Sequence, residues 1–576
     1  MGDVRLAAGV PAPNPLQFGG HRAAEEVLGR PFPTCVRHRR HTDHQSSKVG
    51  SIADGPSLLC IRDVGGPARL AHVPIRCASS LQGYAALPPQ GEAGTTKLTR
   101  REWSRGLLAT LAMLAGACVT LSPSEERRLG QDEAQEVEET VGLVQDPALL
   151  DYVRQVAGRL TQAAETPGVA WRFNVADDAE PNAFALPGGW VYVTRGALVL
   201  LNREDELAGV LGHEMAHVLE RHAARRVAVA TPFAVLFGLP ASILSTVSPT
   251  LGGIVGGTGE LASGAVLAPY SREQERDADR RGIELAARAG YDPTGLAGFL
   301  RTLEREEALE VGREPGRPRF FSTHPTTPER VGNVEAAARS LKRAPDARVA
   351  ATRAAFLAHL DGLLIGNNPA YGVFLGSLFL HPDVDIAFEM PAGWKTVNGP
   401  TAAGAVAPGG DAVVLLTMVG PGEDPVAGAR KEGLSEAQAK RLQRGRMGAL
   451  QTARLVVDTR DGNRAALTWI AHRGHIFRVT GMTRIGDWER YGPGFERTAA
   501  SFRALRPADR ERVVESRLRI RRAAAGETVA QVLARGGGTW NAARLAVANG
   551  TTVDAPLEAG WPVKVAVTQR YHTGNG

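Results

Sequence analysis

The run His213-Glu214-Met215-Ala216-His217 holds residue types whose spacing could support metal-dependent hydrolysis. Side chains four apart lie on one face of a helix, so the imidazoles of His213 and His217 could reach one ion. Glu214 could act as the general base on a water molecule, because zinc lowers the pKa of a bound water toward neutrality. The motif is short, and the alternative is a helix that carries two surface histidines and a carboxylate.

The residues before the motif predict the helix that would position it. Apolar residues recur at helical spacing from Leu207 to Leu211, and Asp205 and Glu206 stand in the first turn, where acidic side chains are favoured. We therefore predict a helix over residues 204–226.

The ligands available to such a site are limited by the cysteines. All four lie in the first fifth of the chain, at Cys35, Cys60, Cys77 and Cys118. A metal site after Cys118 must therefore use histidines and carboxylates. Glu220 and Ala223 occupy the positions where a metzincin would have glycine and histidine, which excludes that class. The remaining option is a glutamate from a second helix.

A second helix is predicted from Ser271 to Ala289, because Gly290 and Pro293 follow it as stop signals. Together, the HExxH motif at residues 213–217 and an ExxAD motif at residues 275–279 resemble the gluzincin peptidases. That group includes CAAX prenyl endopeptidases, HtpX-like membrane proteases and periplasmic quality-control proteases.

The resemblance implies one Zn²⁺ per chain with Glu275 as the third ligand. It implies that Asp279, one turn later, orients a ligand histidine. If this resemblance is set aside, the alternative is that Glu273, Glu275 and Asp277 are charged residues on a solvated helix face.

Two further segments resemble this family. A strand pair around a Pro-Gly-Gly turn is predicted over residues 182–194, and in the family its first strand is a sheet edge on which a peptide can lie. The expected substrate-binding residues are Asn182, Ala183, Phe184, Ala185 and Leu186. The alternative is an ordinary hairpin.

The other segment is the proline-framed loop over residues 322–330, which resembles the family's THPPTPER loop. The resemblance implies that His324 donates to the oxyanion or occupies the fourth zinc position in a resting state. It also implies that Arg330 fixes the loop through Asp279 or another carboxylate. A lone histidine in a loop is more often a surface residue.

Between the two helices, residues 227–259 carry no charge and contain Pro232, Pro240 and Pro249. The corresponding region crosses the membrane in the HtpX-like branch, but the prolines argue against a regular span here. We expect a buried helical hairpin, or a lid on the lipid surface that would gate substrate entry.

The N-terminal region predicts export. Residues 1–96 lack a helical or strand period and are expected to be disordered. Residues 97–118 consist of a basic stretch, an apolar stretch and small residues that end at Cys118, which resembles a bacterial lipoprotein signal with Cys118 as the lipidated residue. Thr99-Arg100-Arg101 also resembles a twin-arginine export signal. A short buried or interfacial helix is the alternative.

A signal segment nearly a hundred residues inside a chain cannot act in the ordinary way, so we expect translation to start near residue 90. The expected location is the periplasmic side of a bacterial cell envelope, with the protein held on the membrane by its lipid.

The predicted fold class is α+β. A mostly helical zincin-type domain with a small edge-exposed sheet spans residues 119–345, and an α+β accessory domain spans residues 346–506. In the accessory domain we predict a connecting helix that reaches Leu364, strands over residues 412–418, 465–471 and 476–481, and helices over residues 435–451 and 494–505. Residues 507–570 resemble a LysM module, a βααβ unit that binds N-acetylglucosamine polymers such as peptidoglycan.

These features predict a zinc-dependent endopeptidase that cleaves envelope proteins. The alternatives are a chaperone-like envelope assembly factor with latent protease activity and a peptidoglycan-binding adaptor. The net charge of +6 is small for 576 residues, and no basic face with interleaved aromatic residues suggests nucleic acid.

Overall fold

The computed structural model describes residues 121–223, 225, 269–309, 320–325, 327, 329–346, 348–458 and 462–573. The expectations for residues 1–96, for the signal segment with Cys118 and for the insert at residues 227–259 lie outside this part of the chain. Within it, no helix has both the length and the apolar character needed to cross a bilayer.

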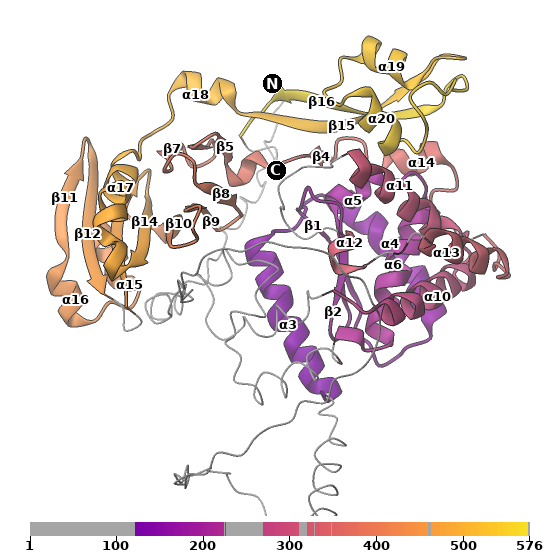
Figure 1. The fold of residues 1–576 in the computed structure, drawn as a ribbon, viewed down its shortest axis with the longest axis horizontal. Helices are drawn as coiled ribbons and strands as arrows, with labels where there is room; N and C mark the ends of the chain where they lie inside the picture. The colour runs from indigo at the N-terminus through magenta and orange to yellow at the C-terminus, as the bar shows by residue number, and fades with distance from the viewer. Residues whose placement is uncertain are drawn as a thin grey trace, which may run out of the picture. The chain divides into compact units, whose positions relative to one another are not determined.

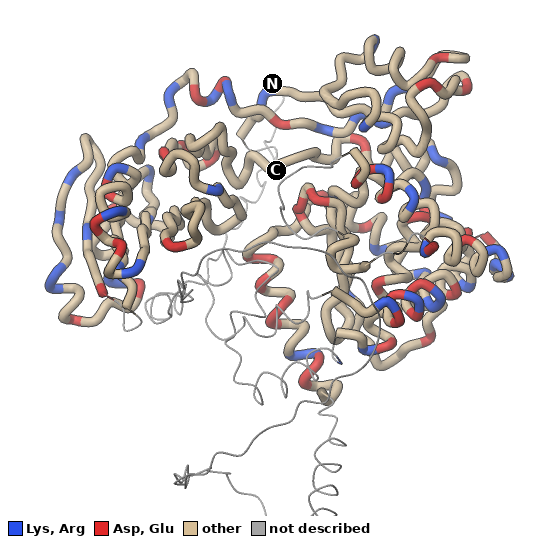
Figure 2. Tube along the Cα trace, in the orientation of Figure 1, with Lys and Arg blue, Asp and Glu red and all other residues tan. Residues whose placement is uncertain are grey.

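The first half is helical around a small sheet (Figure 1). Its main helices are α3 (Pro123–Thr140), α4 (Pro147–Ala164), α5 (Arg195–Leu200), α6 (Glu204–Leu219), α10 (Arg272–Arg288), α11 (Gly295–Leu309), α12 (Phe320–Thr323) and α13 (Arg330–Arg339). The predicted second helix is confirmed as α10, which begins with a capping box between Ser271 and Gln274. Basic and acidic residues are interspersed along α10 (Figure 2).

The predicted helix over residues 204–226 is shorter than expected. Helix α6 ends at Leu219, and Arg221 adopts a left-handed φ of 54° that turns the chain away from the helix axis. The motif itself lies inside the regular part of α6.

The small sheet has the order β1-β3-β2, with β1 (Arg172–Ala176), β2 (Ala183–Leu186) and β3 (Trp190–Thr194). Strands β2 and β3 are antiparallel, which confirms the predicted strand pair. Gly188 and Gly189 have φ values of +82° and +108° in the turn between them, a conformation that other residues rarely adopt. Because β2 is the last strand in the sheet order, it lies at the edge of the sheet.

Helices α6 and α10 approach each other through glycines. A Cβ atom on Gly282 would lie 2.7 Å from the backbone nitrogen of His213, and one on Gly212 would lie 2.8 Å from the carbonyl oxygen of Gly282. Only residues without a Cβ allow this distance, so the two backbones touch where the two motifs must meet.

The second half is rich in strands. A seven-stranded antiparallel sheet has the order β11-β12-β13-β14-β10-β9-β8. Its strands are β8 (Lys395–Asn398), β9 (Ala402–Val406), β10 (Ala412–Pro421), β11 (Gln443–Met447), β12 (Leu450–Asp458), β13 (Asn463–His472) and β14 (His475–Arg484). Helix α17 (Trp488–Ala500) packs on one face through Phe495, and α15 (Pro425–Lys431) packs on the other through Val426. A helical first half followed by a strand-rich second half confirms the predicted α+β class.

Two predicted helices of this half are misplaced. The helix expected over residues 435–451 is limited to α16 (Glu436–Arg441), and the rest forms β11 and the start of β12. Gly448, with φ of +58°, makes the turn between these strands, and pairing with the sheet overrides the helical pattern. The helix expected over residues 494–505 is α17, which begins and ends earlier.

The connecting helix expected to reach Leu364 is also shorter. Helix α14 (Arg353–Ala358) ends early, and Leu364 belongs to the two-residue strand β4 (Leu364–Ile365). Gly362 has φ of +91°, and Leu364 pairs with Arg517, so strand pairing replaces the last helical turn.

The last segment has the order β15 (Val514–Arg522), α19 (Val529–Gly536), α20 (Ala542–Ala548) and β16 (Pro562–Arg570), with the two strands antiparallel. Its Leu545 belongs to the same buried cluster as Leu149 of α4. Lys564 Nζ donates to the carbonyl oxygens of Val199 and Leu201 at 2.7 Å each. Burial holds the pKa of Lys564 well below its usual range. The segment is thus packed onto the helical region and shares its core.

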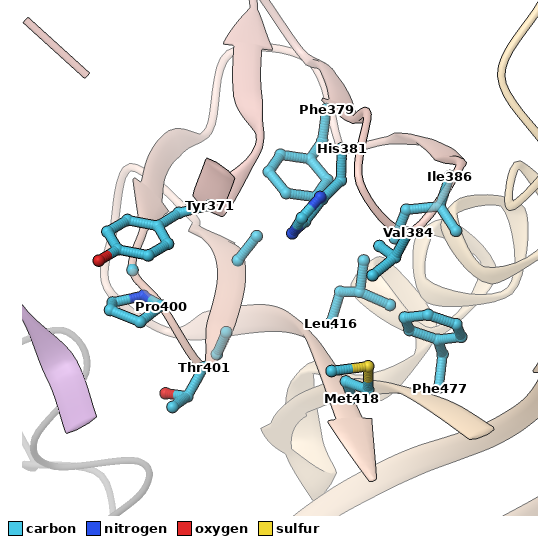
Figure 3. A pocket seen from close by; sticks show the side chains of 13 residues that line it. Tyr371, Phe379, His381, Val384, Ile386, Pro400, Thr401, Leu416, Met418 and Phe477 are labelled. Carbon is cyan, nitrogen blue, oxygen red and sulfur yellow. The ribbon is translucent and has the colours of Figure 1, made fainter. Parts of the chain in front are cut away.

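A small cavity of about 50 Å³ lies between β10, β14 and the sheet formed by β5 (Val373–Leu375), β6 (Leu378–His381) and β7 (Ile386–Glu389) (Figure 3). Its walls are mainly apolar, and burial lowers the pKa of His381, which lies in the lining, to about 4. A space of this size holds roughly three or four water molecules, and among the described residues it has no metal-ligating cluster.

Candidate metal centre

Four side chains that can bind a metal meet in the interior of the helical region. His213 and His217 come from α6, Glu275 comes from α10, and His324 follows α12. One nitrogen or oxygen atom from each lies within 4.8 Å of the others, and all four residues are buried. Buried groups of this kind are unusual unless they are paired or bind a metal.

The distances between these atoms suit a tetrahedral ion. Four ligands about 2.0–2.1 Å from a central ion lie about 3.3–3.4 Å from one another. His213 Nε2 is 3.1 Å from His217 Nε2 and 3.3 Å from His324 Nδ1. Glu275 Oε1 is 3.5 Å from His217 Nε2 and 3.0 Å from His324 Nδ1. The residues present therefore fit one small divalent cation.

The electrostatics of the cluster favour a cation. Burial alone would raise the pKa of Glu275, but His324 and the hydrogen bonds to the histidines outweigh it and hold that pKa well below the usual range. Burial alone would lower the pKa of His324, but the carboxylates of Glu275 and Glu214 outweigh it and raise that pKa. The same negative potential would attract a metal ion.

A buried ion pair lies behind the ligands. Asp279 Oδ1 is 3.0 Å from His213 Nδ1, and Arg330 donates to both oxygens of Asp279, at 2.9 and 2.7 Å. Arg330 also lies 2.8 Å from Glu275 Oε2 and donates to the carbonyl oxygen of His324 at 3.3 Å. The structure thus brings Arg330 to Asp279, as the sequence suggested, and connects the pair to three of the four clustered residues.

Glu214 lies beside the cluster without belonging to it. It is fully buried, and neither carboxylate oxygen has a hydrogen-bond partner within the described residues. Its Oε1 atom is 3.5 Å from His324 Nε2. Burial raises the pKa of Glu214, while His324 and His213 oppose the rise. A buried carboxylate that accepts no hydrogen bond from the described residues can accept a proton at this position.

The expected substrate-binding segment lies next to the cluster. Strand β2 packs against α6, and Ala185 and Leu186 line the same small cavity as His217. Asn182 Oδ1 accepts from the backbone nitrogen of Ala183 at 2.9 Å, and Phe184 stacks on Tyr192. Among the described strands, none pairs with the outer edge of β2. Within this segment, Ala185 and Leu186 share a cavity with a candidate ligand, and the outer edge of β2 is open to a further strand from outside the described residues.

Two residues absent from the sequence prediction touch the cluster. His222 Nδ1 lies 2.9 Å from His217 Nδ1, and the Tyr270 ring stacks on the His217 ring with 3.7 Å between centroids. Burial lowers the pKa of His222 to about 4. The available signal was weak: a histidine five residues after the motif and a tyrosine just before the second helix.

Residues 147–338 match the family model for "Peptidase family M48". The matched range runs from the start of α4 into α13 and contains every residue of the cluster. These residues form an M48 peptidase domain. The M48 domain is a metalloendopeptidase domain, and its buried cluster is suited to a metal ion.

Curated relatives match part of the chain. The beta-barrel assembly-enhancing protease of Yersinia pestis is 30% identical over 247 residues, which cover 42% of this chain and 50% of that protein. The protein of the same name from Escherichia coli K12 is 30% identical over 39% of this chain and 46% of its own length. The mitochondrial metalloendopeptidase OMA1 of Schizosaccharomyces pombe is 34% identical over 36% of this chain and 60% of its own length. The chain thus spans about half the length of these relatives.

Proposed function

We propose that this chain is a zinc-dependent endopeptidase that cleaves proteins of the bacterial cell envelope. The observation that carries the proposal is the buried set of two histidines, a glutamate and a third histidine. Beside this set lies the carboxylate of Glu214, which accepts no hydrogen bond within the described residues. His213, His217 and Glu275 would hold one Zn²⁺, and His324 would complete the four ligands in a resting state. When bound, zinc supplies Lewis acidity that polarises a peptide carbonyl and makes a water molecule more acidic.

The residues of the chain would divide the remaining work. Glu214 would accept the proton of the attacking water at a carboxylate oxygen and then donate it to the leaving amide nitrogen. His324 Nε2 lies near Glu214, and this position supports a second role for His324, in which it would donate a hydrogen bond to the oxyanion. The edge of β2, over residues 182–186, would receive the substrate as an added strand. Asp279 and Arg330 would hold the ligands in place.

The available edge of β2 supports a proposal for the substrate class. An added strand needs a substrate whose backbone is not already paired, so an unfolded β-barrel protein fits and a folded one does not. The names of the bacterial relatives, which refer to β-barrel assembly, support the same class.

We expect the zinc-loaded protein to cut a urea-unfolded outer-membrane β-barrel protein, diluted into buffer, at internal sites. The same polypeptide already folded in detergent should stay intact. Mass spectrometry of the products measures the result. Equal cleavage of both forms would contradict the edge-strand proposal. Stable binding of the unfolded form without cleavage would favour the chaperone-like alternative.

We further propose that Cys118 is lipidated and that the last segment, over residues 507–570, is a LysM-like unit that holds the enzyme close to peptidoglycan. The order β15, α19, α20 and β16 supports the likeness to a βααβ unit. The loop after α20 lies on the M48 domain, because Gly550 approaches Asn202 and Thr551 accepts a hydrogen bond from Arg305. A glycan would therefore have to bind away from that loop.

Cell fractionation tests both attachments. Replacement of Cys118 by Ser should remove the protein from the membrane fraction, because the lipid on this cysteine is the proposed anchor. Retention of the Ser variant in the peptidoglycan sediment, with release by N-acetylglucosamine oligomers, is expected if the last segment binds glycan. A Cys118→Ser protein that stays with the membranes would contradict the lipid anchor.

A further inference from the structure

We propose that His222 and Tyr270 are positioning residues that fix the ring of the metal ligand His217. The inference rests on the proposed zinc site and deepens it, because it names side chains that set the geometry of one ligand. The two residues stand at opposite ends of the segment that joins α6 to α10.

The contact with His222 sets the proton position on His217. His217 Nε2 faces the cluster, 3.1 Å from His213 Nε2, so this nitrogen needs its lone pair for a metal. The proton of His217 must then lie on Nδ1, which is 2.9 Å from His222 Nδ1. His222 Nδ1 therefore accepts this hydrogen bond, and His222 carries its own proton on Nε2. Among the ring rotations open to His217, this contact selects one.

The two ligand histidines have different acceptors. His213 Nδ1 lies 3.0 Å from a carboxylate oxygen of Asp279, whereas the acceptor for His217 is the ring of His222. A carboxylate withdraws the shared proton more strongly than a neutral ring does, so His213 becomes the more electron-rich ligand. The inferred role of His222 is thus chemical as well as steric.

Tyr270 fixes the plane of the same ring. The rings of Tyr270 and His217 are stacked with 24° between their planes, and both residues are buried. The backbone nitrogen of Tyr270 donates to the carbonyl oxygen of Thr323 at 3.0 Å, and Thr323 directly precedes His324. Tyr270 therefore connects the plane of one ligand to the backbone that carries another.

Both residues are themselves held in place. Arg221, in its left-handed conformation, turns the chain so that His222 comes back to α6, and His222 is 1% exposed. Tyr270 precedes Ser271, the residue that caps α10. Since neither side chain rests on a free loop end, each can act as a fixed support for His217.

The test measures metal binding rather than activity. We expect His222→Phe to weaken zinc affinity about 10- to 100-fold, as measured by competition with a chromogenic chelator. The absorption bands of the Co²⁺-substituted protein should shift, because the ligand orientation changes. His222→Asn should stay within about threefold of wild type, because its side-chain oxygen can accept the same hydrogen bond. His381→Phe, at a half-buried histidine in the second half, is the control and should bind zinc normally.

Unchanged affinity and an unchanged Co²⁺ spectrum in His222→Phe would overturn the proposal. If His222→Phe does not fold, His222→Asn and His222→Leu are compared instead. The quantity measured is the rise in Tm that zinc produces in each variant. The proposal predicts a near wild-type rise for Asn and a smaller one for Leu, and equal rises would overturn it. A wild-type protein that binds no zinc would instead overturn the proposed function.

Discussion

Glu214→Gln should lose about 100- to 10,000-fold in kcat while it retains its metal, because a positioned general acid–base contributes about that much. The amide has nearly the shape of the carboxylate but cannot accept the proton of the attacking water. Glu214 makes no hydrogen bond that the folded state would lose within the described residues, and its carboxylate is fully buried. The change should therefore leave the fold intact. Peptide hydrolysis and bound zinc, measured on one sample, give the two readouts.

Glu133→Gln is the matched control. Glu133 lies in α3 with 5% of its surface exposed, and burial raises its pKa to about 8, so it is mostly neutral near pH 7. Glutamine resembles that neutral form, and we expect normal activity. Full activity in Glu214→Gln would contradict the assignment of Glu214 as the general base. Loss of zinc together with activity would show that Glu214 supports the ligands.

The sequence predicted the parts of the site that local pattern determines. The positions of His213, His217 and Glu275 followed from helix periodicity, helix stop signals and a family motif, and α6 and α10 both formed. The glycine contact between those helices was not predictable, because Gly212 and Gly282 carry no sign of the partner each will touch. His222 and Tyr270 were missed for a related reason: their role depends on where the chain returns after a break in the helix.

The second half was predicted less well because its strands depend on distant partners. Residues 443–451 have a helical pattern when read alone, yet they form β11 and the start of β12, which pair with each other and, through β12, with β13. Similarly, Leu364 is a strand residue only because β15 lies beside it. Local propensity cannot supply such contacts, since they join residues far apart in the chain.

Arg330→Met should destabilise the M48 domain by about 3–5 kcal/mol and weaken metal binding. Removal of one member of a buried ion pair leaves the other charge in the interior without compensation. Arg330 is 5% exposed, and its guanidinium is the donor to both oxygens of Asp279. Without it, Asp279 is free to rotate, and His213 loses the acceptor that fixes its ring. Chemical denaturation and a zinc competition assay measure the two effects.

The double variant Asp279→Asn with Arg330→Met separates charge from packing. If the cost of Arg330→Met comes from the unpaired carboxylate, neutralising Asp279 should recover about 1 kcal/mol or more, because neighbouring residues couple by roughly 0.5–3 kcal/mol. Zinc-loaded protein is the better sample, since Glu275, the other partner of Arg330, would then bind the ion. Arg330→Lys should fall between wild type and Met, because an ammonium keeps the charge but cannot make the two parallel hydrogen bonds. A double variant less stable than Arg330→Met would contradict this account and would mean that Asp279 stabilises the fold mainly through His213.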